Sequence, residues 1–170
     1  MGMRGISELE GAILSEIEHR GQQTTFQVRR AFAESVSLEW KGSAGGVYPA
    51  VRRLEQDGLI LASDPAGGRK ARTLSLTETG REALKAWACD ALAGTSVGAD
   101  PFRLRSGIWL LLSQTEREAL FADLDAEIVR QVAQLEALLP VVDPVEKIRL
   151  ELALDLQRGR LTYIREWRGC

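Results

Sequence analysis

The apolar pattern changes its period within the first half of the chain, and this change constrains the fold more than any other feature. Val47, Val51 and Leu54 recur at spacings of four and three, which places them on one face of a helix. The segments 59–62 (LILA) and 72–77 (RTLSLT) are short apolar or alternating runs that are typical of strands. A Pro- and Gly-rich stretch between them favours a turn. The sequence therefore predicts a helix followed by a two-stranded hairpin.

Helix-start signals lie on both sides of this hairpin. Ser7 and Glu10 have the spacing of a capping box, and Gly21 follows at the position where a helix commonly ends. Thr24 or Thr25 begins a second helix. Two further helices are predicted after the N-cap residues Ser43 and Thr77.

The predicted order is helix, helix, helix, strand, turn, strand, helix, which is the order of a winged helix-turn-helix. A two-stranded hairpin is not stable alone, so it must pack on the helices. After the stretch GTSVGADP the pattern is helical throughout. We therefore predict a mainly α fold with three parts: a winged helix-turn-helix domain with a two-stranded β wing (1–93), a linker (94–101) and a C-terminal helical dimerisation region (102–170).

The helix expected after Ser43 carries small and basic residues opposite its apolar face. Gly45, Pro49, Arg52 and, in part, Arg53 lie on that side at 100° per residue. Such a surface can approach a groove of double-stranded DNA closely and contact its phosphates. The predicted hairpin adds the cations Arg69, Lys70 and Arg72. The sequence thus predicts DNA contact through the helix and the wing, with Arg52 as the leading residue.

Residues at the helix starts are further candidates, each with a structural alternative. Thr24 and Thr25 lie where free backbone N–H groups favour a phosphate, although both can act simply as caps. Lys41 and Ser43 flank the start of the next helix, where Ser43 is expected to be a cap first. Tyr48 can pack its ring on the core or turn its hydroxyl outward.

Two long helices are predicted in the C-terminal region, one beginning after Ser113 or Thr115 and one after Asp143, and they suggest how the chain assembles. Both carry wide apolar stripes that cannot be covered fully within a chain of this size. A helix with more than one apolar face needs a partner, which predicts a homodimer. Two reading helices would then face half-sites about 34 Å apart, one turn of B-DNA.

Composition argues against several other functions. The 170 residues include two cysteines and one histidine, too few for a disulfide framework or a histidine zinc site. We find no P-loop, dinucleotide-binding glycine motif or nucleophile elbow, so we expect no enzyme activity, cofactor or metal. The apolar runs are too short to cross a membrane and no secretory signal is present, which predicts a cytoplasmic protein. The formal net charge is only −2, although residues 41–85 hold eight Lys and Arg against five Asp and Glu.

The stretch SAGGVYPAVRRLEQDGLI, residues 43–60, resembles the recognition-helix signature of PadR-type transcriptional regulators. GRK at 68–70, followed by LTETG at 76–80, is similar to the family's wing and the start of its next helix. The resemblance implies a repressor that binds a pseudo-palindromic DNA operator as a homodimer, and it favours DNA contact by Tyr48. The segments TF at 25–26 and ARTL at 71–74 depart from the family's usual Gly-Tyr and aromatic residues, which leaves the operator and the effector open.

Two further hypotheses concern partners other than DNA. Some PadR-like regulators bind flat hydrophobic effectors through aromatic residues at the dimer interface. By that resemblance, Trp87 and Trp109 are candidate residues for a small hydrophobic or aromatic effector, with ordinary packing as the alternative. The alternative function is a winged-helix protein–protein adaptor that does not bind DNA, which the weak net charge permits.

Overall fold

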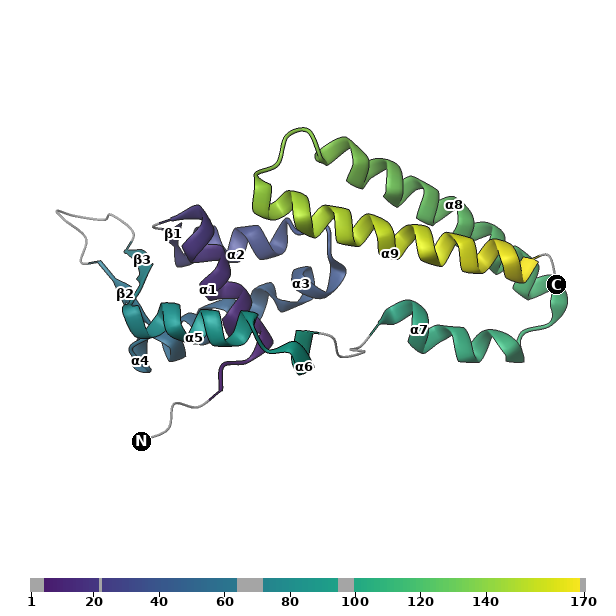
Figure 1. The fold of residues 1–170 in the computed structure, drawn as a ribbon. Coiled ribbons are helices and arrows are strands. Elements are labelled where there is room, and N and C mark those ends of the chain that lie inside the picture. Colours follow the sequence, from purple (N-terminus) through teal and green to yellow (C-terminus); the bar gives the residue numbers. More distant parts are fainter. Residues whose placement is uncertain (1–4, 22, 64–71, 95–99, 169–170) are drawn as a thin grey trace. The chain divides into compact units, whose positions relative to one another are not determined.

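The computed structural model describes residues 5–21, 23–63, 72–94 and 100–168, and it divides into two compact units (Figure 1). The first unit is Met1–Ser96 and the second is Val97–Cys170. Each unit has apolar clusters of its own.

The helices of the first unit begin after capping residues. α1 (Glu8–Arg20) follows the capping box of Ser7 and ends at Gly21, whose φ of 68° lies in the left-handed region. α2 (Thr25–Ala33) follows a second capping box at Thr24. The remaining elements are α3 (Leu38–Ser43), the 3₁₀ turn η1 (Ala44–Gly46), α4 (Val47–Gln56), α5 (Glu78–Ala88) and α6 (Ala91–Gly94).

The sequence pattern does not predict α3, and it misplaces the start of the helix that follows. α3 contains no buried residue, and Trp40 packs edge to face on Phe32 with ring centroids 5.5 Å apart. Ser43, the predicted N-cap of the next helix, is instead the last residue of α3, and its hydroxyl donates to the carbonyl of Glu39 at 3.0 Å. The N-cap of α4 is Gly46, so the predicted cap was wrong.

The sheet has three strands, in the order β1-β3-β2, where the sequence predicts two. β2 (Ile60–Ala62) and β3 (Thr73–Leu76) form the predicted antiparallel hairpin, with Ile60 opposite Leu76. β1 (Gln23–Thr24) pairs antiparallel with the other edge of β3. Because β1 leads directly into α2, the sheet ties the start of α2 to the hairpin.

The core of the first unit lies among α1, α2, α4 and the sheet. Val47, Val51 and Leu54, the predicted apolar face of α4, are at most 4% exposed, which confirms that part of the pattern. The same cluster includes Ile13, Leu14, Ile17, Val28, Phe32, Leu59, Ile60, Leu74 and Leu76. Burial of this face fixes which side of α4 turns outward.

The start of α5 makes one very close approach to the chain that follows α4. The Thr77 hydroxyl accepts from the backbone N–H of Gly80 at 2.9 Å and lies 2.8 Å from the carbonyl oxygen of Gly58. A Cβ at Gly80 would lie 1.9 Å from the carbonyl oxygen of Leu59. Only glycine permits this approach, which accounts for the glycine at position 80.

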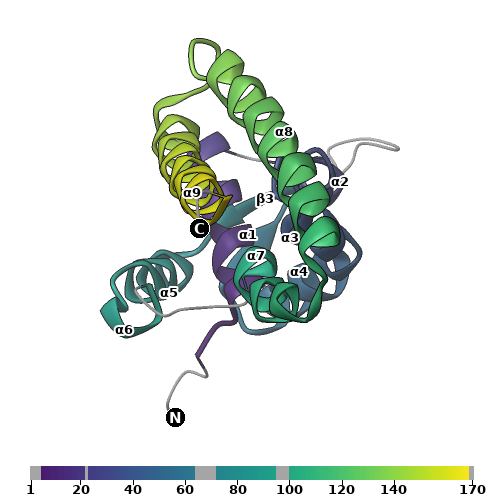
Figure 2. The same cartoon turned by 90° about the vertical axis from the view of Figure 1, so that its right-hand side faces the viewer.

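The second unit is built on two long antiparallel helices. α8 (Gln114–Leu138) and α9 (Pro144–Arg168) lie side by side (Figures 1 and 2). They begin after Ser113 and Asp143, whose side chains accept from first-turn N–H groups. The short elements α7 (Pro101–Ser106) and η2 (Gly107–Leu111) precede them.

Apolar clusters join the elements of the second unit. One contains Trp109, Phe121, Ile128 and Ile164, and the other contains Leu135, Leu150 and Leu154. Arg160 reaches the first cluster, where its guanidinium pairs with Asp100 at 2.5 Å and lies over the ring of Phe102. None of the helices among the described residues is long and apolar enough to cross a membrane.

Candidate nucleic-acid interface

The outer face of α4 lies opposite the buried side chains and borders a hollow of about 150 Å³. Tyr48, Arg52 and Glu55 follow one another at spacings of four and three, so they share this face. The hollow is lined by these three residues with Thr25, Val51, Ala62, Arg72 and Leu74. Residues from α2, α4 and the base of the hairpin therefore meet at one place on the surface.

Arg52, the leading residue among the predicted DNA contacts, lies on this outer face. Its side chain is exposed and makes no hydrogen bond or ion pair with any residue that the structure describes. Tyr48, one turn earlier, is 43% exposed and lies on the rim of the same hollow. Both side chains can therefore reach a ligand outside the protein.

Arg72 also lines the hollow and is already engaged. Its Nη2 donates to Glu55 Oε1 at 2.7 Å, and the same nitrogen lies 3.4 Å from the carbonyl oxygen of Ala62. Both ion-pair partners are partly exposed, so the pair by itself contributes little to stability. Its effect is to fix the position of the guanidinium.

Arg53 points away from the hollow and holds α4 to α1. Its Nε donates at 3.0 Å to Oε1 of Glu10, a carboxylate that is only 1% exposed. Oε2 of Glu10 accepts from the backbone N–H of Ser7 at 2.9 Å. Because a buried carboxylate is costly without its charge partner, the structure gives Arg53 a role in orienting α4, and DNA contact by Arg53 stays a prediction.

The other candidates are spread around this face. Thr24 caps α2, while Thr25 is the first residue of α2 and lines the hollow. Lys41 is exposed on α3, and Ser43 is half-buried. Gly45 and Pro49 are exposed in η1 and in the first turn of α4, with nothing within 4 Å of a Cβ built at Gly45. Arg69 and Lys70 lie outside the described residues.

Two further residues were not among the predicted contacts. Glu55 was overlooked because a glutamate near the end of a helix carries no local signal of its partner, which lies 17 residues later. Arg29 is exposed on α2, one turn after Thr25, and makes no ion pair among the described residues. Its spacing of four from Thr25 was the signal that could have identified it.

The two candidate effector residues have packing roles in separate units. Trp87 covers Gly11 of α1, where a Cβ would lie 2.3 Å from its ring, and its Nε1 donates to Glu8 at 3.2 Å. Trp109 is 6% exposed and packs edge to face on Phe102 and Phe121. Both contacts fit the packing alternative.

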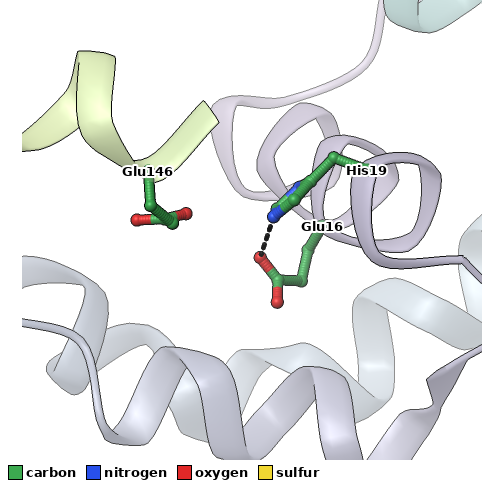
Figure 3. A group of neighbouring side chains, drawn as sticks. All are labelled: Glu16, His19 and Glu146. Carbon is green, nitrogen blue, oxygen red and sulfur yellow. Dashed lines mark ion pairs between the residues drawn. The ribbon is translucent and has the colours of Figure 1, made fainter. Parts of the chain in front are cut away.

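His19 lies in the last turn of α1, close to Glu16 (Figure 3). Its Nε2 is 3.9 Å from Glu16 Oε2, and its Nδ1 lies 2.8 Å from the carbonyl oxygen of Ser15. Glu146 in the same figure belongs to the second unit, so only the two residues of α1 form a group that the structure fixes.

A helix pair that packs on a small antiparallel sheet, with an outward basic helix face beside the hairpin, defines a winged helix-turn-helix protein. Residues 13–86 match the model of the Transcriptional regulator PadR-like family. The chain therefore carries a PadR-like domain over these residues, which confirms the resemblance predicted from its sequence.

Solved structures share the fold over almost the whole chain. Bacillus subtilis PadR in complex with operator DNA is 20% identical, with a TM-score of 0.76, covering 94% of this chain and 97% of that one. The same protein in complex with p-coumaric acid is 17% identical, with a TM-score of 0.69 and 95% of each chain covered. The Vibrio cholerae virulence activator AphA is 21% identical, with a TM-score of 0.68, covering 94% of this chain and 95% of that one. No curated protein matches significantly. These similarities confirm the predicted mainly α, winged helix fold.

Proposed function

We propose that this chain is a cytoplasmic, sequence-specific DNA-binding repressor that binds a pseudo-palindromic operator as a homodimer, through α4 and the wing. One observation carries the proposal. α4 buries its apolar face and turns Arg52 outward, where Arg52 is exposed and has no partner among the described residues. Arg52 lines the same hollow as Ala62, Arg72 and Leu74 at the base of the hairpin. In this proposal α4 enters the major groove, while α2 and the wing contact the phosphates beside it. The protein bound to an operator that overlaps a promoter would exclude RNA polymerase from that promoter.

The homodimer is supported by an uncovered stripe on α9. Ile148, Leu152 and Leu156 are spaced by four residues, and each is more than half exposed. Tyr163 continues the same side of the helix. A stripe of this kind on a long helix is best covered by a second copy that presents the same stripe.

We expect the double variant Arg52→Ala/Lys70→Ala to bind DNA with a weaker salt dependence. Each phosphate contact contributes about 0.9 to the slope of log K against log salt, so losing two per subunit lowers the slope of a dimer by about 3 to 4. The measurement is binding between 50 and 300 mM salt to a duplex selected from a random library by the wild-type protein. Arg81→Ala/Lys85→Ala on α5 removes the same charge and is the control.

Two outcomes would contradict this assignment. A double variant that keeps the wild-type affinity and slope across the salt series would show that these cations do not contact DNA. A wild-type protein that selects no duplex and is not retained on heparin at low salt would instead favour the adaptor function, which the net charge of −2 permits.

We further propose a small aromatic acid as effector. The aromatic cluster of the second unit holds Arg160 over the ring of Phe102, which packs on Trp109. The guanidinium is paired with Asp100 through Nη2, but its buried Nε makes no hydrogen bond with the described residues, so the cluster offers rings for stacking and one donor for a carboxylate. A structure similar to this chain was solved with p-coumaric acid bound.

Titration with p-coumaric acid is expected to quench the tryptophan fluorescence of the wild-type protein in a saturable way. The saturable part should disappear in Trp109→Phe, which keeps an aromatic ring in the core, and should remain in the control Trp40→Phe. Equal saturable quenching in both variants would dismiss a role for Trp109.

A further inference from the structure

The Arg72 side chain joins three elements at the base of the hairpin. Arg72 directly precedes β3, its Nη2 donates at 2.7 Å to Glu55 in the last turn of α4, and it lies 3.4 Å from the carbonyl oxygen of Ala62 at the end of β2. The guanidinium of Arg72 therefore links α4 to β2 and β3 at the base of the hairpin.

Glu55 is an unexpected residue for this surface. It lies three residues after Arg52 on the outer face of α4 and lines the same hollow. A carboxylate there repels the phosphates of DNA, so simple electrostatics predicts tighter binding without it. Its presence calls for a function that outweighs the repulsion.

The geometry of Arg72 supplies this function. The contacts to Glu55 and Ala62 both use Nη2, whereas Nε and Nη1 make no hydrogen bond with the residues that the structure describes. The bound guanidinium thus keeps two donor nitrogens, Nε and Nη1, for another acceptor. Arg52 lines the same hollow, so two cations converge there, with Thr25 at the start of α2.

We propose that Glu55 is a positioning residue that holds Arg72 beside Arg52, so that both bind one backbone phosphate of DNA at the hollow. The proposal rests on the proposed DNA-binding function. A long side chain that is already fixed loses less conformational freedom on binding, so Glu55 strengthens DNA binding although its charge opposes it.

We expect Glu55→Gln to weaken binding of the wild-type-selected duplex about fivefold at 150 mM salt. Glu18→Gln is the matched control, because Glu18 also pairs with an arginine of another element, Arg81, at 3.2 Å and is also partly exposed. This control removes the same charge and is expected to change affinity less than twofold. In an Arg72→Ala background, Glu55→Gln is expected to have no further effect, because the group that it positions is gone.

Three results would overturn the proposal. Tighter binding by Glu55→Gln would show that Glu55 competes with DNA for Arg72, and a change no larger than that of Glu18→Gln would show that it does neither. An equal loss with and without Arg72 would assign the effect to Glu55 alone. Thermal unfolding of each variant separates these outcomes from loss of fold. The variant Arg72→Lys, which keeps the charge but not the forked donors, should weaken binding similarly.

Failure of the wild-type protein to select any duplex would instead refute the proposed function and this inference with it.

Discussion

Replacing Gly80 by alanine is expected to lower the free energy of unfolding of the first unit by about 3 kcal/mol. The new Cβ would lie 1.9 Å from the carbonyl oxygen of Leu59, which is a backbone atom and cannot rotate away. Relief requires α5 to move from the chain that leads into β2, which stretches the bonds from Thr77 to Leu59 and Gly58. For a unit of this size the midpoint of thermal unfolding should fall by roughly 10 to 20 °C.

Gly42→Ala is the control for this experiment, because nothing lies within 4 Å of a Cβ at Gly42 in α3. Its midpoint is expected to stay unchanged or to rise slightly, since alanine favours a helix more than glycine does. Calorimetry of both variants measures the difference. Equal midpoints for Gly80→Ala and the wild type would mean that α5 does not approach β2 as closely as described.

The double variant Leu152→Glu/Leu156→Glu is expected to convert the proposed dimer into monomers and to weaken operator binding by at least about 100-fold. The first effect follows from placing two charges on each copy of an apolar stripe that we propose to be buried between subunits. The second follows because one subunit then binds one half-site without the gain from linked binding. Sedimentation gives the mass, and titration of the selected duplex gives the affinity.

The folded state of the second unit should survive this change. Leu152 and Leu156 are exposed, whereas the residues that α9 packs on α8 are Leu150, Leu154 and Ile164. Thr162→Glu, at an exposed site of α9 that lies about 80° and 120° around the helix from Leu152 and Leu156, adds a charge away from both and should leave the dimer intact. A Leu152→Glu/Leu156→Glu protein that keeps the dimer mass would place the interface elsewhere.

Local signals in the sequence were enough to predict where most of the helices and strands lie. Ser7, Thr24, Thr77, Ser113 and Asp143 each precede a helix in the structure, because a cap acts within one turn and its partner is always near in sequence. The pattern failed at α3, where no residue is buried and hence no apolar period exists. It failed again at β1, since a strand of two residues shows no alternation and forms only because the edge of β3 is open to it.

The site was predictable only in part, for a related reason. The outward direction of Arg52 follows from the buried face of α4, which the apolar spacing reveals. The partners of Arg53 and Arg72 lie 43 and 17 residues away along the chain, so no local pattern separates these arginines from Arg52. Three similar cations on or beside one helix therefore have three different surroundings.

The cross-links of the first unit bear on how its affinity could be regulated. β1 joins the start of α2 to β3, Glu10 holds α4 to α1, and Arg72 ties α4 to the strands. These cross-links leave the first unit little freedom to change its internal conformation. In the proposed dimer, the proposed effector would therefore change the separation between the two N-terminal units, and with it their fit to the spacing of the proposed half-sites.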